Sequence, residues 1–194
     1  MTSGKKGREG ILGDLLSRWR CRKALPFVGH RVLDLGCGKG TILRYLGPGV
    51  RYTGVDRDRR SVSALRRLYP QYEFHLADLD AGLPPLEPGF DTVLLLAVLE
   101  HLRDPQGLLC DCTSLLKAGG KVVITVPTRW GEKVHRFMER LGLVNPEVQA
   151  AHRHVLDGSA LRRLAVEAGG EPCEQRLFQL GCNRLFVYER RAGP

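Results

Sequence analysis

The sequence has no long hydrophobic run. None of its apolar segments approaches the roughly 20 residues that a membrane-spanning helix needs, and the opening residues MTSGKKGR lack the apolar stretch of a signal peptide. The six cysteines are scattered and form no C-x-x-C pair, which disfavours a zinc site and a disulfide framework. These absences predict a cytoplasmic protein with reduced thiols, no metal site and no membrane span.

Charge of one sign is in excess, but it is not concentrated. The formal net charge of +9 suits an anionic partner such as RNA, a phospholipid surface or an acidic metabolite. The basic residues nevertheless occur in short groups along the chain, without one long cluster or an aromatic RNA-binding signature. Solvated helix faces are the favoured alternative, so nucleic acid is an allowed but not a favoured partner.

Glycine, in contrast, follows a pattern. Residues 31–40 read RVLDLGCGKG, an apolar run that ends in Gly36, Gly38 and Gly40. The apolar part predicts a buried strand, and the glycines predict a turn in which a ligand can approach the backbone. A dinucleotide fingerprint is G-x-G-x-x-G, whereas the spacing here is G-x-G-x-G after Asp34. A tight turn without a ligand is the alternative.

This glycine motif resembles the first motif of the class I S-adenosylmethionine (SAM)-dependent methyltransferases. The resemblance implies SAM as the cofactor, with the glycine turn and its Cys37 along the methionine part. It also implies that Asp34 supports the turn and the amino-acid moiety of SAM.

Two further acids follow expected strands. Asp56 ends a strand expected at 50–55, about 20 residues beyond the first glycine, where nucleotide-binding folds place a ribose-binding acid. Asp78 follows a strand expected at 72–77, and the resemblance implies that it and Leu79 contact adenine. A helix-capping acid and a surface-turn acid are the respective alternatives. The resemblance also places Arg57 and Ala97 in the cofactor-binding set, whereas Asp80 is expected to face solvent.

The segment VLEHL at 98–102 follows a continuous apolar run at 90–96 and is similar to the same region of small-molecule methyltransferases, including the ubiquinone-biosynthesis O-methyltransferases. His101 lies beyond this expected strand and is the catalytic candidate, as a general base on a hydroxyl or phenol. The favoured alternative is a histidine that packs beside the cofactor. A K-A-G-G turn and an apolar strand expected at 121–127 extend the resemblance over residues 30–127.

Residues 129–157 are expected to form a substrate-side insertion, with a helix over 129–143 and a loop that contains His152 and His154. These two histidines are candidates for substrate contact, and loop histidines without chemistry are the favoured alternative. No nearby Cys, Asp or Glu completes a metal site with them.

The alternation of strands and helices predicts an α/β fold: a doubly wound, Rossmann-like, mostly parallel seven-stranded sheet with an antiparallel last strand. Residues 1–10 are expected to be a disordered tail, and residues 11–194 a single domain. Its first helix, within 11–28, either covers the core or acts as a lid over substrate and cofactor. Strands expected at 173–180 and 184–189 form the closing hairpin.

The sequence therefore predicts a SAM-dependent methyltransferase that acts on a small organic or lipid-like acceptor. An RNA or protein methyltransferase is one alternative, and a non-catalytic SAM-binding partner subunit is another. A nicotinamide-dependent oxidoreductase is disfavoured by the glycine spacing. No oligomeric state is predicted.

Overall fold

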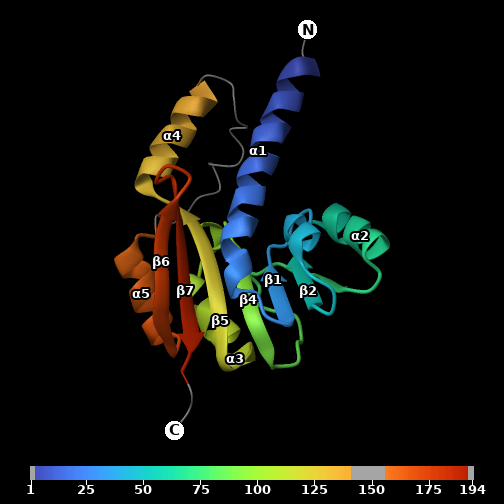
Figure 1. The fold of residues 1–194 in the computed structure, drawn as a ribbon, viewed down its shortest axis with the longest axis vertical. Helices are drawn as coiled ribbons and strands as arrows, with labels where there is room; N and C mark the ends of the chain where they lie inside the picture. Colours follow the sequence, from blue (N-terminus) through green and yellow to red (C-terminus); the bar gives the residue numbers. More distant parts are fainter. Residues whose placement is uncertain (1–2, 141–155, 192–194) are drawn as a thin grey trace.

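Seven strands form one sheet in the order β3-β2-β1-β4-β5-β7-β6 in the computed structural model, which describes residues 3–140 and 156–191 (Figure 1). The strands are β1 (Arg31–Leu35), β2 (Arg51–Asp56), β3 (Glu73–Leu76), β4 (Phe90–Leu96), β5 (Leu116–Pro127), β6 (Gly170–Phe178) and β7 (Asn183–Arg190). Neighbours from β3 to β5 pair in parallel, and β7 is antiparallel to both β5 and β6. The predicted fold class is confirmed, including the antiparallel last strand.

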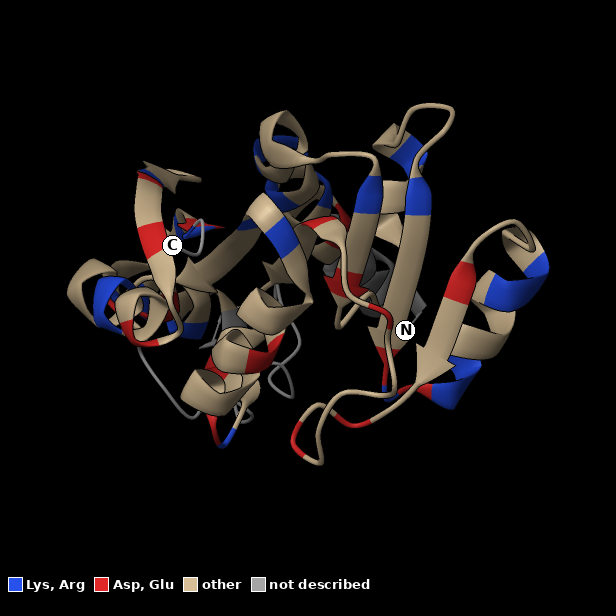
Figure 2. Ribbon diagram, turned by 90° about the horizontal axis from the view of Figure 1, so that it is seen from below, with Lys and Arg blue, Asp and Glu red and all other residues tan. Residues whose placement is uncertain are grey.

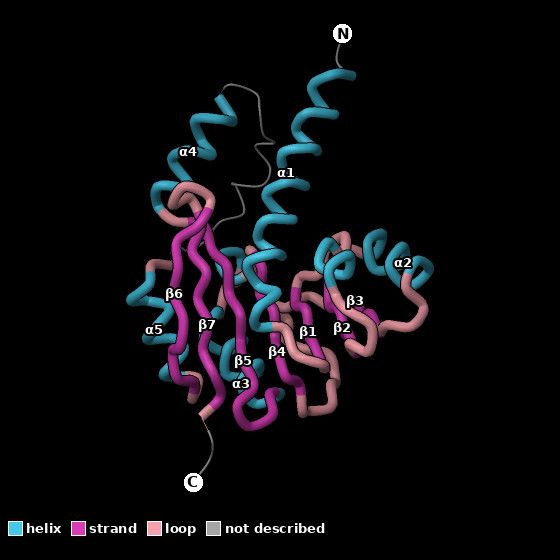
Figure 3. Tube along the Cα trace, viewed as in Figure 1, coloured by secondary structure: helices cyan, strands magenta, loops and turns pink. Residues whose placement is uncertain are grey.

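Helices cover both faces of the sheet (Figure 3). They are α1 (Ser3–Ala24), α2 (Arg59–Leu68), α3 (Pro105–Leu115), α4 (Arg129–Arg140) and α5 (Gly158–Glu167), with short 3-10 helices η1 (Leu25–Phe27), η2 (Thr41–Tyr45) and η3 (Leu99–His101). One core cluster joins the sheet to α3 and α5, and a second joins the opposite face to α1 and α2. The central strand β4 is therefore covered on both sides, which explains the apolar run Val93–Leu96 within it.

The first helix begins earlier than the sequence analysis predicts. Residues 3–10, expected to be disordered, belong to α1. Lys5, Lys6 and Glu9 favour a helix and no proline precedes Pro26, whereas the three glycines of the segment disfavour it. At 22 residues α1 is long enough to cross a bilayer but is too polar, and no other helix among the described residues qualifies either.

Other elements differ from the prediction mainly at their ends. The glycine turn is followed only by the short 3-10 helix η2, since Gly40 at its start is left-handed and a Gly-Pro pair soon follows its end. Asp157 caps α5, its carboxylate accepting the Ala160 N–H at 2.9 Å. Of the expected insertion, α4 and residues 156–157 are described, whereas residues 141–155 lie outside the described residues, His152 and His154 among them.

Candidate functional site

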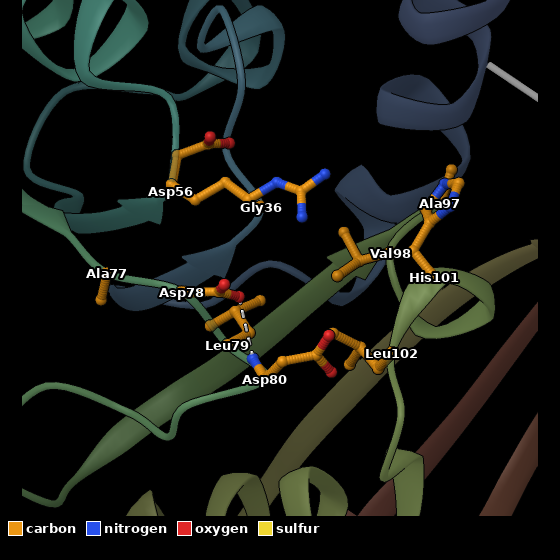
Figure 4. Close-up of a pocket in the computed structure, with 11 residues that line it drawn as sticks. Gly36, Asp56, Ala77, Asp78, Leu79, Asp80, Ala97, Val98, His101 and Leu102 are labelled. Carbon is orange, nitrogen blue, oxygen red and sulfur yellow. Dashed lines mark hydrogen bonds between the residues drawn. The ribbon is translucent and has the colours of Figure 1, made fainter. Parts of the chain in front are cut away.

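The strand order reverses between β1 and β4, so loops leave the carboxyl ends of these strands in opposite directions. Ligands of open α/β sheets bind at such a switch point. A cavity of about 310 Å³ lies there, at the carboxyl ends of β1, β2, β3 and β4. Its lining residues are Gly36, Asp56, Arg57, Ala77, Asp78, Leu79, Asp80, Ala97, Val98, His101 and Leu102 (Figure 4).

The glycine turn forms one wall of this cavity. Gly36 and Gly38 have left-handed φ angles of 74° and 52°, which side chains disfavour. The Gly36 and Cys37 N–H groups both donate to Val55 O, at 2.8 and 3.1 Å, and so tie the turn to β2. A Cβ on Gly36 would lie 2.5 Å from Val98 Cγ2. Glycine is thus required where the end of β1 meets the segment that follows β4.

Asp56 connects the end of β2 to the glycine turn. Its Oδ2 accepts the Gly38 N–H at 2.7 Å, and its Oδ1 accepts the Asp58 N–H at 2.8 Å. A carboxylate oxygen has two lone pairs, so each oxygen of Asp56 keeps capacity for a further donor. The side chain is both a brace for the turn and an acceptor at the cavity wall.

The turn after β3 contributes further acidic side chains to the wall of the cavity. Because Asp56 pairs with Leu76 in the parallel register, Asp78 emerges beside the end of β2. Figure 4 shows Asp56 and Asp78 on one side of the cavity and Ala97, Val98 and His101 on the other. Asp78 Oδ1 accepts the Asp80 N–H at 3.1 Å, which shapes this turn.

Asp80 lies in the cavity wall, so its expected solvent-facing position is wrong. Its Oδ1 accepts the Arg103 N–H at 2.7 Å, and Arg103 Nε lies 3.7 Å from Oδ2. This contact joins the turn after β3 to the loop after η3, two segments distant in sequence. It thereby holds together the two sides of the cavity.

The segment after β4 enters the site through a strained residue. Ala97 has φ of 61°, unusual for a side chain with a Cβ, while its N–H still donates to Thr125 O at 2.9 Å. The chain therefore leaves the sheet abruptly after Leu96 and turns into η3, which brings His101 to the cavity. Strained positions of this kind cluster at functional sites.

Asp34 lies behind the glycine turn and does not line the cavity. Its side chain is buried in the core, where the Tyr52 hydroxyl donates to Asp34 Oδ2 at 2.7 Å. Burial raises the pKa of Asp34 to about 7, although the Tyr52 hydrogen bond opposes the shift. The resemblance implies that Asp34, Asp56 and Asp78 all hold SAM, but only Asp56 and Asp78 line the cavity.

Glu100 is a buried acid beside the site that sequence reasoning did not single out. It is 1% exposed, and its Oε2 has no hydrogen-bond partner among the described residues. Burial raises the pKa of Glu100 to about 7; Arg20 of α1 opposes the shift and Glu132 of α4 adds to it. Helices α1 and α4 thus both act electrostatically on the segment that carries His101.

The predicted cofactor set divides in two. The residues that line the cavity are Gly36, Asp56, Arg57, Asp78, Leu79 and Ala97, together with the catalytic candidate His101. Asp34, Cys37, Gly38 and Gly40 do not line it. The lining residues that sequence reasoning missed are Ala77, Asp80, Val98 and Leu102, all of which flank predicted residues in the same turns.

Comparison with protein families gives a match over most of the chain. A family described as a methyltransferase domain matches residues 6–175. The ubiquinone biosynthesis O-methyltransferase of Maricaulis maris is 32% identical over an alignment of 198 positions, and the match covers 87% of this chain and 74% of that protein. A tRNA U34 carboxymethyltransferase of Stutzerimonas stutzeri is 35% identical over 117 residues, which cover 56% of this chain and 37% of that protein. For the relatives first found, the chain spans about half of their length.

Solved structures show the same fold. A chain in the complex between the Haloferax volcanii Trm112 methyltransferase activator and a methyltransferase has a TM-score of 0.74 at 20% identity, covering 98% of this chain and 95% of that one. Magnesium protoporphyrin IX methyltransferase from Synechocystis, with bound S-adenosylhomocysteine, has a TM-score of 0.67 at 18% identity, covering 95% and 86%. At these identities the likeness concerns the fold alone.

Proposed function

Because the chain belongs to the class I SAM-dependent methyltransferases, we propose that it transfers a methyl group from SAM to a small organic or lipid-like acceptor. The observation that carries the proposal is the cavity at the switch point, where Asp56 and Asp78 face the segment that bears His101. An acid at the end of β2 with spare acceptor capacity suits a ribose diol, which is a paired hydrogen-bond donor.

The residues present fit the cofactor. Asp56 would accept the ribose hydroxyls, Asp78 the adenine amino group, and Leu79 would pack near the ring. Gly36, whose missing Cβ keeps the turn clear of Val98, would lie along the methionine part. Bound SAM supplies an electrophilic methyl group on a sulfonium, which is a good leaving group. Orienting the acceptor in line with that bond and excluding water would then supply most of the rate enhancement.

His101 is the residue that we assign to proton handling. It lines the cavity on the side opposite Asp56, next to the strained Ala97. An imidazole there would accept the proton of an acceptor hydroxyl as the oxygen attacks the methyl group. Acceptors that ionise by themselves would not need it. The proposal therefore ties the importance of His101 to the acidity of the acceptor.

The choice of a small acceptor rests on the relatives and on one sequence feature. Ubiquinone biosynthesis O-methyltransferases recur among them, and a trans-aconitate 2-methyltransferase is 34% identical over 110 residues. The segment after Leu96 reads AVLE, not the Asn/Asp-Pro-Pro-aromatic motif of many amino-directed nucleic-acid methyltransferases. Both features favour a carbon or oxygen nucleophile on a small molecule.

An RNA substrate is the second candidate. The net charge of +9 and the tRNA-modifying relative favour it. However, Lys and Arg are distributed over several elements rather than gathered in one track (Figure 2). A role that requires a partner subunit is the third candidate, and the fold neighbour solved with the Trm112 activator motivates it.

Calorimetry with SAM, S-adenosylhomocysteine and NAD tests which cofactor the protein binds. We expect binding of the first two and none of NAD. Turnover of methyl-labelled SAM is then measured with phenols, carboxylic acids, long-chain quinols and tRNA at a SAM concentration near the Kd, where Asp56→Ala should turn over more slowly. Methylation of tRNA alone would replace the proposal with the second candidate, and absence of SAM binding would overturn it.

A further inference from the structure

The exposed side of α4 combines large apolar and basic side chains. Trp130 and Phe137 are 58% and 62% exposed. Arg129, Lys133 and Arg136 are exposed on the same helix, whereas its acid Glu132 is half-buried. Through residue 138, where side chains are described, no exposed residue of α4 is acidic. Water is a poor solvent for the two rings, and no described part of the chain shields them from it.

The hairpin between β6 and β7 adds another bare apolar residue. Gln179, Leu180 and Gly181 all have left-handed φ angles, of 52°, 55° and 80°, and Leu180 is 93% exposed. Left-handed backbone is costly for leucine, and an exposed leucine brings no packing in return. The hairpin therefore exposes an apolar side chain to solvent at a position where that side chain does not stabilise the fold.

These two segments adjoin. The Thr128 hydroxyl, just before α4, donates to Gly181 O at 2.6 Å, and Thr128 N–H donates to Cys182 O at 2.9 Å. Trp130 and Gly181 also line one hollow together with Leu177, which is itself 58% exposed. We call the exposed side of α4, Leu177 and the hairpin 179–182 the α4–hairpin face.

The α4–hairpin face lies at the carboxyl end of the sheet, the end at which the cavity opens. Figure 1 shows α4 and the hairpin above the sheet at that end. The chain order agrees, because α4 begins directly after β5, whose Thr125 pairs with Leu96 at the end of β4. Whatever this face binds therefore lies at the end of the sheet at which the cavity opens.

Helix α2 shows that the combination is not general to the surface. It exposes Arg59, Arg60, Arg66 and Arg67, so it carries one positive charge more than the exposed side of α4. It has no aromatic residue, and its one large exposed apolar side chain is Leu68. Charge alone occurs on α2, whereas charge together with aromatic rings occurs on α4.

We propose that the α4–hairpin face docks on the headgroup region of an anionic lipid bilayer, from which the enzyme takes an amphiphilic acceptor. Tryptophan and phenylalanine are the residues that bury into this boundary, and lysine and arginine meet the lipid phosphates. The proposal rests on the proposed function and narrows its acceptor class to molecules held in a membrane. It requires no membrane-spanning helix.

Vesicle binding tests the docking directly. The protein is sedimented with phosphatidylcholine vesicles, with and without phosphatidylglycerol, and we expect binding only when the anionic lipid is present. The chain has two tryptophans, so Trp19→Phe leaves Trp130 as the only reporter. Its emission should shift to the blue on anionic vesicles and be quenched by brominated lipid tails. An unchanged emission would overturn the proposal.

Matched variants separate this face from charge in general. Lys133→Gln with Arg136→Gln should weaken vesicle binding roughly 25-fold, at about fivefold per charge, whereas Arg59→Gln with Arg60→Gln should weaken it less. Leu180→Ser should weaken binding and Leu68→Ser should not. Equal effects of the two charge pairs, or a dimer that Trp130→Ala dissociates, would overturn the proposal. So would tRNA binding that is lost in the α4 variants without any vesicle binding.

The closing measurement distinguishes two kinds of failure. SAM binding by calorimetry should be unchanged in the α4 and hairpin variants, because none of their residues lines the cavity. A protein that binds SAM but no vesicle would refute the docking face and leave the proposed function intact. A protein that binds vesicles but no SAM would refute the proposed function.

Discussion

The Asp56 carboxylate accepts the Gly38 N–H at 2.7 Å, so the acid at the end of β2 fixes the conformation of the turn at the end of β1. The residue assigned to ribose is thus also a structural brace for the backbone assigned to the methionine part of SAM. The ribose and the methionine part of SAM would therefore be recognised by groups that are already hydrogen-bonded to each other. This preorganisation lowers the cost of ordering the site on binding.

We predict that Asp56→Ala lowers the affinity for SAM roughly 10- to 100-fold, because a hydrogen bond to a charged acceptor contributes about 1.5–3 kcal/mol. Asp56→Asn should lose less, since its amide oxygen still accepts one N–H. Calorimetry measures both. Asp58→Asn is the matched control: it changes a neighbouring acid that caps α2, and it should leave SAM affinity unchanged. Unaltered affinity in Asp56→Ala would refute the assignment.

Gly36→Ala should destabilise the protein by about 1–3 kcal/mol, which corresponds to a fall in Tm of roughly 2–12 °C. Two causes combine, a φ of 74° and a Cβ that would lie 2.5 Å from Val98 Cγ2. Adding Val98→Ala removes the clash but not the backbone strain, so stability should recover only in part. Gly47→Ala is the control, because its Cβ would meet nothing within 4 Å and its φ is not left-handed. Full recovery of stability in the double variant would show that the left-handed φ of residue 36 does not contribute to the destabilisation.

The strands and the acid at the end of β2 could be predicted because their signals are local. A run of apolar residues, such as Val93–Leu96 in β4, indicates a buried strand, and the residues at the end of a parallel strand lie at the carboxyl edge of the sheet. Asp56, Asp78 and Ala97 all follow this rule, and all line the cavity. Sequence spacing is enough to gather them.

The positions of Asp34 and Asp80 depend on partners far along the chain, which spacing does not reveal. Asp34 turns into the core because Tyr52, on the neighbouring strand, offers a hydroxyl there. Asp80 turns into the cavity wall because Arg103 donates its N–H from beyond η3. The aromatic and basic side of α4 was visible as sequence, but only the fold shows which of its side chains are exposed and what adjoins them.

The stability of the protein should fall as the pH rises from about 4 through about 7. Burial raises the pKa of Asp34 to about 7, so the folded state binds more protons than the unfolded state in this window, and folding is opposed as the proton leaves. Tyr52→Phe removes the hydrogen bond that opposes this shift. Urea unfolding should therefore show a greater loss in Tyr52→Phe at pH 8 than at pH 5. Tyr69→Phe, whose ring stacks on Tyr72, serves as the control, and equal losses in Tyr52→Phe at both pH values would contradict the prediction.

Glu100 is a second buried carboxyl group that should contribute to the same loss of stability with rising pH. Burial raises the pKa of Glu100 to about 7, so its ionisation also opposes folding above about pH 5. Glu100→Gln should stabilise the protein at pH 8 by up to about 3 kcal/mol and leave its stability at pH 4 nearly unchanged. The part of the pH-dependent loss of stability that Asp34 causes should remain.

Two charged neighbours of Glu100 should shift its pKa in opposite directions, and a change in packing alone would not produce this opposition. Glu132 raises the pKa of Glu100 and Arg20 lowers it. Glu132→Gln should therefore move the midpoint of the pH-dependent loss of stability to lower pH, and Arg20→Gln should move it to higher pH. Urea unfolding at closely spaced pH values, in an Asp34→Asn background that isolates Glu100, measures both shifts. Shifts of the same direction in the two variants would show that Glu100 does not titrate between α1 and α4.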